Sequence, residues 1–334
     1  AHASSYTRKT RAVLRDRRIP FRWIARGGPQ DVDVPPVPVA LVPVLAWTGP
    51  GGDTAMVDST FQIGRLEEAF PTRSIVPSDP VAAFLSALVE DYADEWLTKA
   101  MFHYRWAYAP DAGQASRVIP LDQNPMMPPE QLEHGGAAFA ERQIGRLAVV
   151  GSTPATAPVI EASYRRLLLV LDGILRHAPF LFGARPSAAD FALFGQLSQL
   201  ATFDPTSTAV AAEVAPRVIA WVHGVDDLGS LPDPATDDWR PRDAVVPALR
   251  PLLAEIGRVY APFLVANAAA LAAKAERVAC AIDGAAWTQA PFPYQGKCLR
   301  WLRERHAALA PADRAAVDAA LAGTGCETLL ATGT

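Results

Sequence analysis

The chain has 334 residues, half of them hydrophobic, and its 35 acidic and 31 basic residues give a net charge of −4. This length exceeds that of one average core and predicts two domains plus an extension, while the lack of a basic excess argues against nucleic acid as the main partner. No apolar run reaches the ~20 residues that a bilayer span needs, and the three late cysteines, an odd number, are typical of reduced thiols in a cytosolic protein.

The first helix is predicted to begin at the hydroxyl residues Ser4 and Ser5. They precede an amphipathic run in which Val13 and Leu14 fall at helical spacing. Hydroxyl side chains favour helix N-termini because their oxygens accept the free amide hydrogens there. The same terminus carries about half a positive charge, so it attracts an anion or a thiolate. A hydroxyl is therefore expected where it would stabilise a bound anionic ligand.

The basic side chains of this helix are expected to face outwards. Lys9 and Arg11 are predicted to be surface or dimer-contact groups rather than catalysts. Arg15, Arg17 and Arg18 form the densest basic cluster and are predicted to be the solvated end of the helix.

An α/β region is predicted after this helix, because Ile19-Pro20-Phe21 favours extended backbone and glycine and proline mark turns. The expected elements are a strand over 20–27, a proline-rich loop over 30–41, strands near 43–47 and 55–58 on either side of a turn at 49–53, a helix up to about 69 and a linker over 71–80. An all-helical part is expected from there on.

The helical part is predicted to open at Asp79-Pro80, a cap and a first-turn proline. Four acidic residues lie beside the apolar face of its first helix: Glu90, Asp91, Asp94 and Glu95. Like charges at spacing four cost a few tenths of a kcal/mol per pair, so the cluster needs compensation. Solvation, an intersubunit contact or pairing with Lys99 and Arg105 is expected. A metal site is not predicted, because no histidine lies within one helical turn of these acids.

The remaining elements follow from proline positions and helical periodicity. They are a long loop over 107–135, helices near 136–149 and 156–177, one or two long helices over 242–274, an aromatic and amide-rich loop over 281–295, and helices near 295–309 and 311–322. Ser187 is predicted to cap a further helix, with Asp190 bonding back to the amide of the cap. This motif is structural, so Phe182 and Asp190 are not expected in an active site.

Four segments of the chain, in the same order, resemble the glutathione S-transferase family. They are the hydroxyl-rich start of the first helix, Val42-Pro43-Val44-Leu45, Asp58-Ser59-Thr60, and the run from Phe182 to Asp190. In that family the second segment holds a cis-proline, the third opens a helix, and the fourth is a G-x-x-P-(S/T)-x-A-D signature of the helical domain. One such match would be weak, but four in the right order indicate the fold.

The resemblance implies a fold class and a division into domains. Residues 1–72 are expected to form an α/β thioredoxin-like domain that binds glutathione, and 79–230 an all-helical bundle domain. Residues 240–334 lie outside the resemblance and are expected to form a helical extension packed on the helical domain. A thioredoxin-like domain needs a strand before the hydroxyl loop, and this first strand is missing from the sequence. Truncation is the preferred explanation, and cleavage of a secretory signal is the alternative.

The resemblance also assigns a catalytic position. Ser4 matches the position of the catalytic Ser or Cys and would donate its hydroxyl to the glutathione sulfur. Ser5 or Tyr6 would replace it if the hydroxyl position differs, and Ser4 would then be only a cap or a loop hydroxyl. A serine at this position favours conjugation, because a cysteine would suggest disulfide exchange.

The resemblance implies further contacts to glutathione from the α/β domain. The Val42 backbone would pair with the central cysteine of the tripeptide, next to Pro43 in cis. Asp58 and Ser59 would hold the γ-glutamyl end at a helix N-terminus. The alternative for Ser59 is a purely structural cap.

Two aromatic groups outside this domain are candidates for the substrate side. Tyr104 and Trp106 would line a pocket for an apolar substrate, as in the family, or simply pack in the core. Trp287, Phe292 and Tyr294 would either fold over the ligand cleft or pack the extension on the helical domain, which is the preferred interpretation.

The expected function is that of a cytoplasmic, homodimeric glutathione S-transferase of the detoxification type. Glutathione would be its co-substrate, with a small hydrophobic electrophile as the second substrate, and no metal, membrane or nucleic acid is expected. The alternative is a non-catalytic homologue that acts as a binding or scaffolding protein, its extension contacting a protein partner. Asp58 leaves room for this alternative, because many relatives carry Glu or Gln there.

Overall fold

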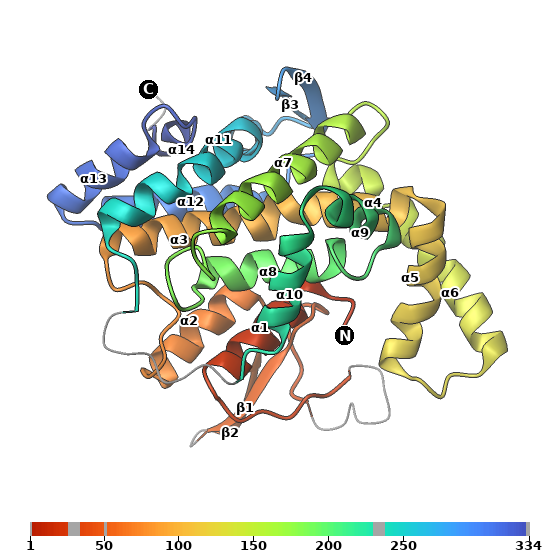
Figure 1. Ribbon diagram of the computed structural model, residues 1–334. Coiled ribbons are helices and arrows are strands. Elements are labelled where there is room, and N and C mark those ends of the chain that lie inside the picture. Colours follow the sequence, from red (N-terminus) through yellow and green to blue (C-terminus); the bar gives the residue numbers. More distant parts are fainter. Residues whose placement is uncertain (1, 26–33, 50–51, 230–237, 332–334) are drawn as a thin grey trace.

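A computed structural model describes residues 2–25, 34–49, 52–229 and 238–331 (Figure 1). A small α/β part comes first in the chain and helices make up nearly all the rest. In Figure 1 the β1–β2 hairpin lies at the bottom of the view and the β3–β4 hairpin at the top, with the helical body between them. The α/β part packs on the body through α1, which lies along α8.

The α/β part consists of two helices and one antiparallel hairpin. Its elements are α1 (Ser5–Asp16), β1 (Leu45–Gly49), β2 (Gly52–Met56) and α2 (Ser59–Ala69). Leu45 pairs with Met56, and the register runs from there to the predicted turn. The Val42–Pro43 peptide bond is cis, as the sequence predicted.

The strand predicted over 20–27 is absent from the residues of this segment that the structure describes. Residues 20–25 adopt no regular secondary structure, and 26 and 27 lie outside the described residues. A strand needs a neighbour to accept and donate its backbone hydrogen bonds, and the described part of the chain places none in a ladder with this segment. Of the proline-rich loop expected over 30–41, residues 34–41 are described and contain neither helix nor strand.

The central body is helical. Its elements are α3 (Pro80–Tyr92), the π-helical segment η1 (Ala93–Leu97), α4 (Thr98–Ala107), α5 (Ala109–Gln123), α6 (Pro129–Ile144), the 3₁₀ segment η2 (Leu147–Val150), α7 (Ala157–Leu175), α8 (Ala188–Leu200), α9 (Pro205–Val214) and α10 (Pro216–Asp226). Asp79 caps α3, with its carboxylate accepting from the Ala82 amide at 2.9 Å, as predicted. The π-helical η1 continues α3 into α4, and such segments are frequent near functional sites.

The long loop predicted over 107–135 is wrong, because α5 and the first part of α6 occupy it. These two helices form an antiparallel pair that projects from the body (Figure 1). Pro110 and Pro129 stand in the first turns of their helices, where a missing amide hydrogen costs nothing. The prolines therefore mark helix starts here, and the sequence interpretation took them as loop residues.

Helix α8 lies at the centre of the core, and every one of its residues is buried. The predicted capping box is confirmed: the Asp190 carboxylate accepts from the Ser187 amide at 2.9 Å, and the Ser187 hydroxyl caps the Asp190 amide. Gly195 allows α1 to approach, because a Cβ there would lie 2.7 Å from the Ser5 carbonyl oxygen. This close contact fixes the start of α1 against the body.

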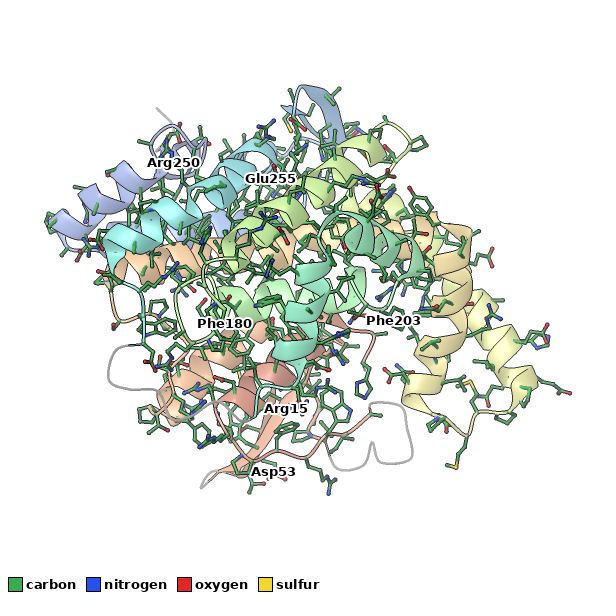
Figure 2. The ribbon with its side chains drawn as sticks, viewed as in Figure 1. Arg15, Asp53, Phe180, Phe203, Arg250 and Glu255 are labelled. Atoms are coloured by element: carbon green, nitrogen blue, oxygen red, sulfur yellow. The ribbon has the colours of Figure 1, made fainter. Side chains whose placement is uncertain are left out.

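The C-terminal elements are α11 (Arg242–Ala272), β3 (Val278–Ile282), β4 (Ala285–Gln289), α12 (Pro293–Ala307), α13 (Pro311–Leu321) and α14 (Glu327–Leu330). Helix α11 packs on α3 and α7, and Figure 2 shows its Glu255, which accepts from Arg166 of α7 at 2.7 Å. The aromatic loop predicted over 281–295 is instead largely the β3–β4 hairpin and the start of α12. Asp283 and Gly284 both have positive φ at its turn, and such an Asp-Gly pair is a strong hairpin signal.

Candidate functional site

The first turn of α1 carries the three hydroxyl residues that the resemblance singles out. The Ser4 hydroxyl oxygen accepts from the Thr7 amide at 3.3 Å, so Ser4 caps the helix. Ser5 is buried, and the Tyr6 hydroxyl donates to the Asp94 carbonyl oxygen at 2.8 Å. Burial raises the pKa of Tyr6 well above its ordinary value. Tyr6 is thus a protonated phenol engaged with η1.

The prediction that Lys9 is a surface or dimer-contact group is wrong, because its side chain is 0% exposed. The ammonium Nζ lies 2.7 Å from Glu90 Oε1 and 2.6 Å from Asp94 Oδ2. Burial alone would lower the pKa of Lys9, but the two carboxylates outweigh it and hold the pKa above the ordinary value. Lys9 therefore supplies the compensation that the acidic cluster requires. Glu90 and Asp94 are four residues apart on one helix face, and this spacing of like charges indicates that a cation lies nearby.

The solvated helix end predicted for Arg15, Arg17 and Arg18 is wrong for Arg17, which is buried and lies 2.8 Å from Glu67. Arg11, predicted as a surface or dimer-contact group, is partly buried and donates to Asp226 of α10 at 2.9 Å. Arg18 is exposed, as predicted.

The other acidic residues of the cluster have partners different from those expected. Asp91 accepts from the Tyr260 hydroxyl at 2.6 Å, and burial raises the pKa of Asp91 to about 7 and that of Glu95 to about 8. Arg105 instead pairs with Asp204 at 2.8 Å. The described residues contain no group of acids, histidines and cysteines arranged to hold a metal ion.

Lys99 is buried on the other side of η1. Its ammonium donates to the Val150 carbonyl and to Gln289 Oε1, both at 3.1 Å, and lies 4.2 Å from the centre of the Phe263 ring. Burial lowers the pKa of Lys99 to about 7, although Glu95 attracts its charge. Contacts with Val150 of η2 and with Gln289 and Phe263 of the extension therefore replace the predicted pairing of Lys99 with the acidic cluster.

Gln62 holds the cis-proline segment against the start of α2, and the sequence interpretation missed it. Its amide nitrogen donates to the carbonyl oxygens of Pro43 at 2.9 Å and of Met56 at 3.0 Å. Its amide oxygen accepts from the Thr10 hydroxyl of α1 at 3.1 Å. Gln62 is fully buried, so these bonds fix three segments relative to one another. Val42, which precedes Pro43, is by contrast 40% exposed.

A cavity of about 580 Å³ opens beside the cis-proline. Val42 and Pro43 line it, together with Thr7 of α1 and the rings of Trp23 and Trp47. Most of its wall is apolar. Ser4, Asp58 and Ser59 are not among its lining residues.

Asp58 and Ser59 form the N-terminus of α2. The Asp58 carboxylate accepts from the Thr60 amide at 3.1 Å, so Asp58 rather than Ser59 is the cap. Its second oxygen accepts from the hydroxyl of Tyr294, a residue of α12, at 2.6 Å. Ser59 is buried as the first residue of the helix.

Tyr104 and Trp106, the residues predicted to line a substrate pocket, are buried. Tyr104 stacks on Tyr108 with ring centres 5.6 Å apart, and Trp106 packs edge-on against Phe139 at 5.5 Å. Neither lines the cavity beside Pro43. Trp287 of the extension packs against Trp96 in the core, with ring centres 5.3 Å apart.

Comparison with known proteins identifies two domains. A model described as the glutathione S-transferase N-terminal domain matches residues 1–74, and one described as the glutathione S-transferase C-terminal domain matches 137–224. No curated protein and no solved structure gives a significant match. In the part of the chain that the structure describes, no helix combines the length and apolar character of a bilayer span. The matches and the helix–hairpin–helix order confirm the predicted fold class: a thioredoxin-like first part, an all-helical second part and a helical extension.

Proposed function

The chain belongs to the glutathione S-transferase family, and from this premise we propose that it is an enzyme that joins glutathione to a hydrophobic electrophile. The observation that supports this most is the match over residues 1–74 together with the cis bond at Pro43. Gln62 ties that segment to the start of α2, so the parts that would hold the tripeptide have a fixed relation.

We propose Ser4 as the residue that stabilises the glutathione thiolate. A free thiol has a pKa of about 8.5, and lowering it by about two units requires roughly 2.7 kcal/mol. A hydroxyl hydrogen bond to the sulfur and the positive end of α1 are of that order together. The cap contact uses the Ser4 oxygen as an acceptor, which leaves its hydrogen available for the sulfur. The thiolate then attacks the electrophilic carbon, and the leaving group departs with the bonding electron pair.

The tripeptide backbone would be held by Val42 and the start of α2. Val42 is exposed beside the cavity, which suits strand-like pairing with the cysteinyl residue. Asp58 would receive the γ-glutamyl ammonium, and Ser59 with the free amides of α2 the carboxylate. Tyr104 and Trp106 belong to the proposed substrate side only if the helices around them open, since both are buried.

Other aspects of the family are part of the same proposal. We propose that the protein is a homodimer in the cytoplasm and acts in detoxification, with glutathione as co-substrate.

The catalytic proposal is tested by retention on immobilised glutathione and by turnover of a generic aryl halide. We expect Ser4→Ala and Ser4→Asn to lower turnover by about 100-fold, the order found when one donor to a developing anion is removed. Asn keeps the helix cap that Ala removes, so equal losses in both variants assign the effect to the hydroxyl. Ser4→Thr is the control that keeps both functions. Retention with undiminished turnover in Ser4→Asn would remove Ser4 from this role.

A non-catalytic binding or scaffolding role is the second candidate. The observation that favours it is that Ser4, Asp58 and Ser59 do not line the cavity beside Pro43. Absence of both retention and turnover in the wild-type protein would support this role.

A further inference from the structure

Asp58 and Tyr294 are far apart in the sequence and meet at the start of α2. The Tyr294 hydroxyl donates to Asp58 Oδ2 at 2.6 Å, while Asp58 Oδ1 accepts from the Thr60 amide. Asp58 has a φ of +78°, a region that non-glycine residues rarely adopt. Such a conformation persists only where its surroundings fix it. The two hydrogen bonds hold both oxygens of the carboxylate in one orientation.

Tyr294 is itself held firmly by the extension. It follows Pro293 in the first turn of α12. Two residues before Tyr294, the backbone of Phe292 is held by Asn267 of α11, which donates to its carbonyl at 3.0 Å and accepts from its amide at 2.8 Å. Asn267 is fully buried. The phenol therefore reaches Asp58 from a rigid support.

Aromatic packing joins the same two helices. The Trp301 ring of α12 lies edge-on to Tyr294 at 5.8 Å and edge-on to Phe61 of α2 at 5.2 Å. Phe61 is three residues after Asp58, so this contact places α12 against the first turn of α2. Gln295, the next residue of α12, donates to the Glu95 carbonyl at 3.3 Å.

We propose that Tyr294 is a positioning residue of the glutathione site, through which the extension orients the Asp58 carboxylate for the γ-glutamyl ammonium. This inference rests on the proposed function. A carboxylate oxygen has lone pairs for more than one donor, so Asp58 can keep the Tyr294 bond and accept the ammonium as well. Fixing the carboxylate beforehand lowers the entropy that binding would otherwise cost. The extension would thus contribute to recognition of the tripeptide.

The experiment is calorimetric titration of the full chain with glutathione and with cysteinylglycine, which lacks the γ-glutamyl group. We expect Tyr294→Phe to weaken glutathione binding about tenfold, the effect of losing one hydrogen bond to a charged group. Cysteinylglycine binding should not change. The KM for glutathione should rise with kcat at saturation unchanged. Tyr108→Phe is the matched control, because it removes a similar bond, to Glu161 at 2.6 Å, in the helical part.

Asp58→Asn separates this inference from the proposed function. Adding Tyr294→Phe to Asp58→Asn should weaken binding no further, since the two residues act through one contact. Trp301→Leu, which keeps the hydroxyl but removes its packing ring, should weaken glutathione binding in the same direction. If Asp58→Asn weakens binding while Tyr294→Phe and Trp301→Leu leave it unchanged, the role of Tyr294 is refuted and the proposed function stands. If the wild-type protein binds no glutathione, the proposed function itself fails.

Discussion

At the residue scale, buried charges connect the α/β part to the helical body. Lys9 comes from α1, and its partners Glu90 and Asp94 come from α3 and η1. Thr60 of α2 joins them by donating to Glu90 at 3.2 Å. Burial raises the pKa of Asp94 to about 6, while Lys9 draws it down. Removing one member of such a group leaves an uncompensated charge in the interior.

We expect Lys9→Met to lower the free energy of unfolding by about 3–5 kcal/mol, because Glu90 and Asp94 then face each other without a cation. The triple variant Lys9→Met/Glu90→Gln/Asp94→Asn should recover much of this loss, since none of these three charges remains. Urea unfolding at pH 7 measures both. A single variant as stable as the wild-type protein would show that the three charges are not coupled.

Lys99 gives a pH dependence of stability with a definite sign. In the unfolded chain its amine stays protonated up to about pH 10.4, but burial lowers its pKa in the folded chain to about 7. Between these values the unfolded state binds more protons, so the contribution of Lys99 to stability increases as the pH rises. The slope is at most about 1.4 kcal/mol per pH unit.

The variant Lys99→Met isolates this contribution. Unfolding free energies at pH 7, 8 and 9 should rise more steeply with pH in the wild-type protein than in the variant. Parallel pH curves for the two proteins would mean that Lys99 titrates normally in the fold.

The residues of the site differ in how far the sequence predicts them. The cap at Ser4 follows from a local rule about hydroxyls at helix starts, whereas the cis bond at Pro43 and the acid that opens α2 follow from the family resemblance. Lys9, Gln62 and Tyr294 act through partners far away in the chain. A spacing rule that works within one helix carries no information about which helix lies opposite.

At the element scale, helix caps and turns were the dependable signals, and proline was ambiguous. The capping box of α8 was predicted correctly because all its atoms lie within four residues. Prolines stand in the first turns of α5, α6 and α12, at positions where the sequence analysis predicts loops. Proline starts a helix as readily as it ends one, so its position alone did not distinguish the two. The Asp283-Gly284 pair is a hairpin signal in the sequence, and it accounts for the β3–β4 hairpin where a loop is predicted.

The capping box provides a graded test at this scale. Ser187→Ala should cost about 1 kcal/mol, the usual value of a lost cap. Asp190→Ala should cost more, because Asp190 also accepts from the Leu181 amide at 2.9 Å and each buried amide left unpaired costs about 1–3 kcal/mol. Urea unfolding of both variants gives the comparison. Equal losses would mean that the Leu181 contact adds nothing.

At the scale of the whole molecule, the extension is part of the core. Helix α11 packs on α3 and α7, and the β3–β4 hairpin supplies Trp287 to the ring cluster around Trp96. The sequence predicted that this region would pack on the helical domain, and the contacts agree. The resemblance alone could not indicate how much of the core it provides, because the family signature ends before it.

Helix α11 provides the last prediction. Its fully buried apolar side chains include Leu249, Leu252, Leu253, Ile256, Val259, Phe263 and Leu264. Burying one such side chain contributes about 1.5–3 kcal/mol, so the loss of seven costs roughly 10–21 kcal/mol, a sum comparable to or larger than the 5–15 kcal/mol by which proteins are usually stable. We therefore expect a chain ending at residue 239 to lack a cooperative thermal transition and near-ultraviolet circular dichroism. Co-expression with a separate fragment of residues 240–334 is the matched control and should restore both signals. Cooperative melting of the shortened chain by itself would show that the first two parts form an independent core.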